Sequence, residues 1–120
     1  MTGKRILVVD DEENLRRVTQ LRLQQAGYDV VTAADGNQAL AFLERNPRDL
    51  VLTDLRMPGL SGIELLGKIK EAYPEVVVIL VTAFGTIESA VEAMKHGAYD
   101  YVIKPVNAEA LKLILSRALE

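Results

Sequence analysis

The chain of 120 residues contains no cysteine, and this absence excludes disulfide bonds and thiolate metal sites. It has no run of 18 apolar residues, so a membrane-spanning helix is not expected. No basic cluster stands out and the formal net charge is -3, which disfavours direct nucleic-acid binding. The Gly-x-Gly-x-x-Gly and Gly-Lys-Ser/Thr motifs are also missing, which argues against dinucleotide and P-loop sites. A chain of this length forms one domain with its own core.

Short apolar runs alternate along the chain with longer amphipathic stretches. Three of the runs are almost continuously apolar, which is typical of strands covered by helices on both faces. Five strand–helix alternations predict a parallel sheet between two helical layers. Right-handed crossovers and a change of winding direction then place a crevice at the carboxyl ends of the strands. The predicted strands are Arg5–Val9, Asp29–Ala33, Leu50–Thr53, Val76–Val81 and Tyr99–Ile103.

Capping residues and helix-ending residues predict the limits of the helices. Asp35 with Gln38 and Ser61 with Glu64 have the spacing of a capping box. Helical spacing groups Leu65, Leu66, Ile69 and Lys70 on the third helix, Ala90, Val91 and Met94 on the fourth, and Leu111, Ile114, Leu115 and Ala118 on the fifth. Further caps are predicted at Thr86 and Asn107, and helix ends at Gly27, Pro47, Pro74 and Gly97.

The first predicted helix has a less regular apolar face. Leu15, Val18, Leu23 and Ala26 share one side of it, and Arg22 falls near the centre of that side. The Arg22 stem either extends past apolar neighbours toward solvent or ends in a buried ion pair. The sequence leaves both alternatives open.

Chemically related side chains follow four of the predicted strands. The strand ends carry Asp10-Asp11-Glu12, Asp54, Thr82-Ala83 and Lys104-Pro105. Because parallel strands place their carboxyl ends at one edge of the sheet, we expect these groups to converge. Two carboxylates about 4 Å apart repel by about 4 kcal/mol at an effective dielectric constant of about 20, so a compensating cation is needed. Oxygen ligands without His or Cys favour Mg²⁺, Mn²⁺ or Ca²⁺, and Lys104 adds one positive charge.

This set of groups suits phosphoryl transfer. A carboxylate can act as a covalent nucleophile toward a phosphoryl group, and the reaction depends mainly on positioning and charge neutralisation. Simpler explanations compete at each position. Asp54 could end a strand, Asp10 and Asp11 could cap a helix, and Lys104 could be a solvated charge. Thr82 and Tyr101 could be ordinary strand residues, while His96, Met57, Met94 and Phe84 are interpreted as a helix-end residue and three packing residues.

The chain resembles, from near its start to its end, the receiver domains of two-component response regulators. The stretch from Thr82 through Phe84-Gly85-Thr86 and Ala93-Met94-Lys95 to Tyr101 is most similar to the NtrC-like subgroup. The motifs that carry the resemblance are Ile6-Leu7-Val8-Val9-Asp10-Asp11-Glu12, Asp54-Leu55-Arg56-Met57-Pro58-Gly59 with Gly62, Thr82-Ala83, and Gly97-Ala98-Tyr99-Asp100-Tyr101 followed by Lys104-Pro105.

The resemblance implies a flavodoxin-like receiver fold over residues 1–120, with five helices and five parallel strands in the order 2-1-3-4-5. It also implies a role for each motif residue. Asp54 accepts the phosphoryl group, Lys104 holds a phosphoryl oxygen, Thr82 moves to bond another oxygen, and Tyr101 follows it inward. Asp10, Asp11, Asp54 and the backbone carbonyl of Arg56 would hold Mg²⁺, or Mn²⁺ in its place. The Lys104-Pro105 peptide is expected to be cis, against a base rate of about 5–6% for X–Pro bonds.

The function implied by the resemblance is that of a cytoplasmic switch rather than an enzyme. A sensor histidine kinase would donate the phosphoryl group, and an attached or partner output domain would control transcription. The domain would weakly catalyse both its own phosphorylation and its own dephosphorylation, which would be slow. Phosphorylation could also drive homodimer formation. Neither nucleic acid nor membrane would be contacted by this segment, which is expected to be the N-terminal part of a longer regulator. The alternatives are a Mg²⁺-dependent aspartyl-phosphate hydrolase and a protein-binding receiver that is not phosphorylated.

Overall fold

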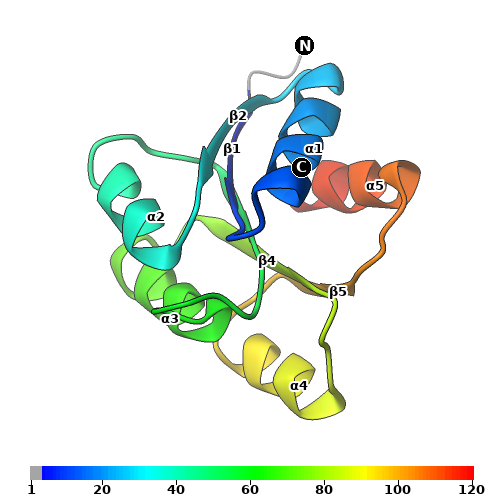
Figure 1. The fold of residues 1–120 in the computed structure, drawn as a ribbon. Helices are drawn as coiled ribbons and strands as arrows, with labels where there is room; N and C mark the ends of the chain where they lie inside the picture. Colours follow the sequence, from blue (N-terminus) through cyan, green and yellow to red (C-terminus); the bar gives the residue numbers. More distant parts are fainter. Residues whose placement is uncertain (1–3) are drawn as a thin grey trace.

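The computed structural model describes residues 4–120 as a five-stranded parallel sheet between two layers of helices (Figure 1). The strand order is β2-β1-β3-β4-β5, so the predicted order 2-1-3-4-5 is confirmed. No helix in this described range is both long and apolar enough to cross a lipid bilayer. The elements are β1 (Arg5–Val9), α1 (Glu13–Gln25), β2 (Asp29–Ala33), α2 (Gly36–Leu43), β3 (Leu50–Thr53), α3 (Gly62–Ala72), β4 (Val77–Thr82), α4 (Ile87–Lys95), β5 (Asp100–Ile103) and α5 (Ala108–Ala118).

The central strands are apolar on both faces because each face meets a helical layer. In β1, Ile6 and Val8 pack toward α1 and α5, whereas Leu7 and Val9 pack toward α2, α3 and α4. All four are at most 3% exposed. The continuous apolar runs noted in the sequence are therefore confirmed as strands buried from two sides. Two predicted strands differ slightly, since β4 begins and ends one residue later than predicted and β5 begins one residue later.

Most of the predicted helix caps are present. Ser61 and Glu64 form a complete capping box, and the Thr86 and Asn107 side chains accept backbone N–H groups of α4 and α5. The predicted box at Asp35 is half formed. Asp35 accepts from the Gln38 N–H at 2.8 Å, but the Gln38 side chain accepts from the Ala34 N–H.

Two of the predicted apolar helix faces are partly exposed. Leu15 and Val18 of α1 are 46% and 42% exposed, because they border a cavity of about 360 Å³ between α1 and α5. Arg22 lines the same cavity from an exposed position, so it is not a buried ion pair. On α4 the buried residue is Ala93, a side chain small enough for close packing on the sheet. The predicted Val91 and Met94 are instead 49% and 50% exposed.

Candidate functional site

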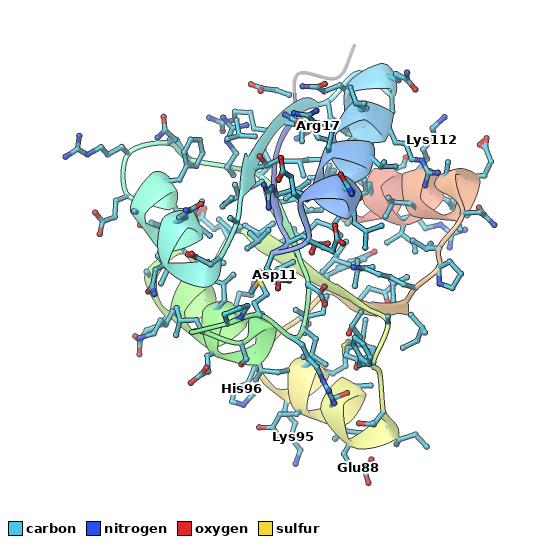
Figure 2. All side chains as sticks on the ribbon, viewed as in Figure 1. Asp11, Arg17, Glu88, Lys95, His96 and Lys112 are labelled. Carbon is cyan, nitrogen blue, oxygen red and sulfur yellow. The ribbon has the colours of Figure 1, made fainter. Side chains whose placement is uncertain are left out.

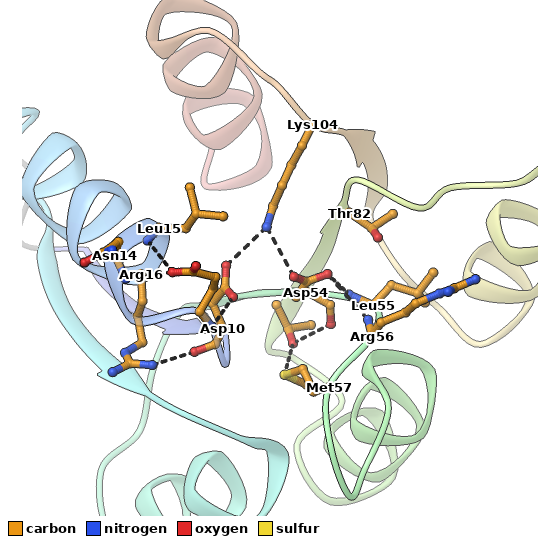
Figure 3. Close-up of polar contacts among 12 residues, drawn as sticks. Asp10, Asn14, Leu15, Arg16, Asp54, Leu55, Arg56, Met57, Thr82 and Lys104 are labelled. Carbon is orange, nitrogen blue, oxygen red and sulfur yellow. Dashed lines mark hydrogen bonds and ion pairs between the residues drawn. The ribbon is translucent and has the colours of Figure 1, made fainter.

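The polar site lies at the carboxyl edge of the sheet, where β1 and β3 meet and the winding direction changes (Figure 3). Asp10 directly follows β1, Asp54 follows β3 and Lys104 follows β5. Main-chain hydrogen bonds continue past the strand ends and hold these positions. The Asp54 N–H donates to the Val9 carbonyl at 3.0 Å, and the Lys104 N–H donates to the Thr82 carbonyl at 2.8 Å.

Lys104 bridges two carboxylates at this edge. Its Nζ lies 3.2 Å from Asp10 Oδ2 and 3.2 Å from Asp54 Oδ2. The Asp10 and Asp54 side chains are only 9% and 14% exposed, so water screens this contact less than it would on an open surface. The interpretation of Lys104 as a solvated charge is therefore wrong.

The remaining carboxylate oxygens are held by backbone N–H groups. Asp54 Oδ1 accepts from the N–H of Leu55 at 2.7 Å and from that of Arg56 at 3.4 Å. Asp10 Oδ1 accepts from the Glu12 N–H at 2.9 Å. The N-cap of α1 is Glu12, whose side chain accepts from the first turn of the helix, so neither Asp10 nor Asp11 is the N-cap. The capping alternative for these two acids is thereby excluded.

Asp11 completes a cluster of three carboxylates. One oxygen from each of Asp10, Asp11 and Asp54 lies within 4.8 Å of the others. Lys104 is the one basic side chain that forms an ion pair with this cluster within residues 4–120, which leaves an excess of negative charge. Hard carboxylate oxygens at this spacing fit a divalent cation such as Mg²⁺. The donor set therefore matches the predicted metal, and Asp11, which is exposed, offers its oxygens to solvent.

The electrostatics of the cluster act on Lys104. Burial by itself disfavours the charged ammonium group, but the adjacent Asp10 and Asp54 carboxylates outweigh that cost and raise the pKa of Lys104 above its ordinary value of 10.5. A raised pKa in the folded state means that folding is stabilised by the ammonium form. This contribution is complete below pH 10.5 and is lost as pH rises through the folded-state pKa.

We predict that Lys104→Met removes this contribution of the ammonium group to stability. The variant should be less stable than the wild type at neutral pH, because Asp10 and Asp54 lose their shared counter-charge, and the difference should shrink above pH 10.5. Urea unfolding at a series of pH values measures it. Lys112→Met is the matched control, since Lys112 is exposed on α5 (Figure 2). A gap between the Lys104 variant and the wild type that stays constant to high pH would refute the assignment.

The two predicted switch residues lie on neighbouring strands. Thr82 is fully buried at the end of β4, and its Oγ1 accepts from the Phe84 N–H at 3.1 Å. Tyr101 is partly buried on β5, and its hydroxyl oxygen lies 2.5 Å from Ser89 Oγ at the start of α4. The structure thus links Tyr101 to α4, while Thr82 is linked to the loop that precedes this helix.

Several functional contacts were not foreseen from the sequence. One is the contact of Ser89, whose place three residues after the Thr86 cap is a signal for a second polar contact in the first turn of α4. At Gly62 the backbone passes so close to the Asp54 carbonyl oxygen that a Cβ atom would lie only 2.3 Å from it, so a side chain there would clash. Phe84 was expected to be a packing residue, yet it is 60% exposed and lies against the Arg56 guanidinium. Met57 does pack against the core.

The loop after β5 has the predicted backbone. The Lys104-Pro105 peptide bond is cis, as expected from the resemblance. His96, interpreted as a helix-end residue, is the C-cap of α4, where its ring nitrogen lies 2.9 Å from a carboxylate oxygen of Glu92. His96 is exposed at the end of α4, and Asp11 lies at the carboxyl edge of the sheet (Figure 2).

Comparison with known proteins agrees with this geometry. The family model described as the response regulator receiver domain matches residues 6–116. Regulatory protein AtoC of Escherichia coli is 42% identical over 116 residues, which are 97% of this chain and 25% of AtoC. NtrX of Azorhizobium caulinodans is 43% identical over 117 residues, 96% of this chain and 26% of that protein. The solved receiver domain of NtrX from Brucella abortus superposes with a TM-score of 0.90 at 40% identity, covering 95% of this chain and 97% of that one.

These relatives also confirm the resemblance to the NtrC-like subgroup. The chain spans about a quarter of the length of the curated relatives it matches. By its sequence, its strand order and the carboxylate cluster with its bridging lysine, this chain belongs to the response regulator receiver domain family.

Proposed function

We propose that this domain accepts a phosphoryl group on Asp54 from a phosphohistidine of a partner kinase and thereby switches an output surface. One observation carries the proposal: Lys104 bridges Asp54 to Asp10 at the carboxyl edge of the sheet, with Asp11 completing the acidic cluster. Membership of the receiver family implies a kinase and an output domain as partners. The greater length of the relatives supports an attached output domain, and the printed name of one relative, a transcriptional regulatory protein, supports a role of that domain in transcription.

The chemistry follows from how the Asp54 carboxylate is held. One of its oxygens forms a bond to phosphorus while the P–N bond of the donor phosphohistidine breaks. The electron pair of that bond stays on the imidazole nitrogen, which then takes up a proton. Asp54 Oδ1 is fixed by two backbone N–H groups and Oδ2 by Lys104, so the nucleophile is oriented before the donor arrives.

A metal ion belongs to this proposal. Receiver domains in general use Mg²⁺, and we expect Asp10, Asp11, Asp54 and the Arg56 carbonyl to hold it here. When bound, Mg²⁺ supplies positive charge that offsets the charge on the phosphoryl oxygens during in-line transfer. Lys104, already charged and placed beside Asp54, would then keep one phosphoryl oxygen in position.

The proposal describes a switch rather than an enzyme. Incubation with Mg²⁺ and acetyl phosphate, followed by intact-mass measurement, tests it. A phosphoryl adduct on the chain supports the switch. Continuous phosphate release without an adduct would favour a hydrolase, and no reaction would favour a receiver that only binds proteins. We also place the domain in the cytoplasm, with no nucleic-acid contact of its own, in line with its family and its net charge of -3.

The output surface in this proposal is formed by α4, β5 and α5. If the Thr82 hydroxyl turns toward a phosphoryl oxygen, the hydrogen bond that the Phe84 N–H donates to Thr82 Oγ1 is broken, and the loop before α4 moves. Tyr101 can then leave Ser89 and fill the space near Thr82. The exposed residues whose partners change would include Glu88, Glu92, Lys95 and His96, and this surface could also serve a phosphorylation-dependent homodimer.

Thr82→Ala is predicted to separate phosphorylation from switching. The variant keeps Asp54 and Lys104 and should still take up phosphoryl groups. In the wild type we expect phosphorylation to increase amide hydrogen exchange in the segment 83–101, and in the variant this increase should be severalfold smaller. Exchange mass spectrometry at a known adduct fraction measures this. Thr82→Ser is the matched control, because it keeps the hydroxyl group and should retain most of the response. An Ala variant that responds as fully as the wild type would remove the hydroxyl from the mechanism.

A further inference from the structure

A stacked Arg–Phe pair connects the two loops beside the phosphoacceptor. The Arg56 guanidinium carbon lies 5.0 Å from the centroid of the Phe84 ring, within the range of a cation–π contact. Arg56 belongs to the loop after β3, and Phe84 belongs to the loop after β4. Phe84 is 60% exposed, so burial in the core does not hold its ring. The Arg56 side chain is therefore its specific partner.

Phe84 is held at two atoms by two different residues of the site. Its ring lies against Arg56, and its backbone N–H donates to Thr82 Oγ1 at 3.1 Å. Thr82 is the residue proposed to turn toward the phosphoryl group. Both restraints on Phe84 thus come from residues close to Asp54. Arg56 lies two residues after it in the chain, and Thr82 ends the neighbouring strand β4.

Arg56 is free to exchange its partner. Among residues 4–120 its guanidinium forms no ion pair, and its side chain is exposed. The side chain starts beside the acceptor, because the Arg56 N–H lies 3.4 Å from Asp54 Oδ1, yet it is directed away from that carboxylate (Figure 3). Rotation about its side-chain bonds can bring the guanidinium back toward Asp54.

Phosphorylation changes which partner the guanidinium prefers. A phosphoryl group carries a charge of about -1.5 to -2 and three strong acceptor oxygens. A guanidinium group binds such oxygens through two parallel N–H donors, and this contact is stronger than stacking on an exposed ring. We infer that Arg56 binds the phosphoryl group on Asp54, leaves Phe84 and so releases the loop before α4. This inference rests on the proposed phosphorylation of Asp54.

The result would be a phosphoryl group held by two cations from different loops. Lys104 approaches from the β5 end, where it already contacts Asp54 Oδ2 at 3.2 Å, and Arg56 approaches from the loop after β3. Phe84 would lose its ring contact and its N–H acceptor in the same event. The charge on Asp54 would thereby control the β4–α4 loop through Arg56 in addition to Thr82.

Fluorine NMR can follow the Phe84 ring directly, because the chain contains two phenylalanines. The second, Phe42, lies on α2 with its ring centroid 5.2 Å from the Arg48 guanidinium carbon, and it serves as an internal reference. Biosynthetic incorporation of 4-fluorophenylalanine should give two resonances, and Phe84→Leu assigns them. With Mg²⁺ and acetyl phosphate we expect the Phe84 resonance to shift and the Phe42 resonance to stay in place. Intact mass gives the adduct fraction in the same sample.

Arg56→Gln supplies the decisive comparison, and it leaves the Arg56 backbone in place. Without phosphorylation the variant should already show a displaced Phe84 resonance, and its further shift per adduct should be smaller than that in the wild type, because only the contact with Thr82 is then left to be lost. Arg17→Gln, which removes the same charge from an exposed position on α1 (Figure 2), should behave as the wild type does.

The outcomes are distinguishable. Absence of any adduct on the wild type overturns the proposed function, and the inference with it. An adduct whose Phe84 shift is as large in Arg56→Gln as in the wild type overturns the inference alone. The same holds if the Phe84 resonance of the unphosphorylated protein is unchanged by that substitution.

Discussion

Asp54→Asn should abolish the phosphoryl adduct that the wild type forms with Mg²⁺ and acetyl phosphate. An amide is no nucleophile toward phosphorus, and no other carboxylate in the cluster is held in the same way, by two backbone N–H groups on one oxygen and Lys104 on the other. We expect loss to the detection limit of intact-mass measurement. The fold should persist, because asparagine has the same shape and its amide oxygen can accept the same backbone N–H groups.

Asp35→Asn is the matched control for this variant. It removes the same charge from the loop after β2, and asparagine caps a helix as well as aspartate does. This control should form the adduct as the wild type does. An undiminished adduct on Asp54→Asn would mean that the acceptor is a different residue, with Asp11 the first to examine.

The second large effect is expected from Asp11→Asn. Asp11 is exposed and contributes one of three converging carboxylates, so its loss should leave the core intact while removing a ligand oxygen from the metal site. Metal ions contribute several kcal/mol of charge stabilisation in such reactions, so we expect phosphorylation to slow by about a hundredfold or more. The thermal stabilisation that Mg²⁺ gives the wild type should also largely disappear.

In metal-free buffer the same variant should unfold at a higher temperature than the wild type. Removing Asp11 relieves its repulsion with Asp10 and Asp54, a cost that Lys104 offsets only in part. Circular dichroism melting with and without Mg²⁺ measures both effects. Glu13→Gln, an equal charge change in the first turn of α1, is the control. Mg²⁺ stabilisation of Asp11→Asn equal to that of the wild type would exclude Asp11 as a ligand.

The sequence predicted the sheet and its polar edge well for a clear physical reason. Strands buried on both faces must be apolar throughout, so β1 and β3 are visible as uninterrupted runs, and the polar residues that end them must lie at the edge. The convergence of Asp10, Asp11 and Asp54 follows from that rule and from parallel pairing. The identity of the residue that would receive the phosphoryl group came from the family motif.

Contacts between side chains of different loops were beyond prediction from the sequence. The Arg56–Phe84 pair depends on how two loops are placed in space, which no periodicity encodes. The N-cap of α1 could not be chosen from the sequence, because Asp10, Asp11 and Glu12 all have cap-forming oxygens and only the backbone turn decides among them. On α4 the apolar pattern did not reveal that the small Ala93 faces the sheet while Met94 faces solvent.

The central claim is that Asp54 is the phosphoacceptor, and locating the modified residue tests it most directly. Borohydride reduces an aspartyl phosphate to homoserine, which peptide mapping by mass spectrometry can assign to a position. After reaction with Mg²⁺ and acetyl phosphate, the account predicts homoserine at position 54 and at no other aspartate. Homoserine at position 10 or 11, or an unmodified Asp54 in a protein that carries the adduct, would contradict it.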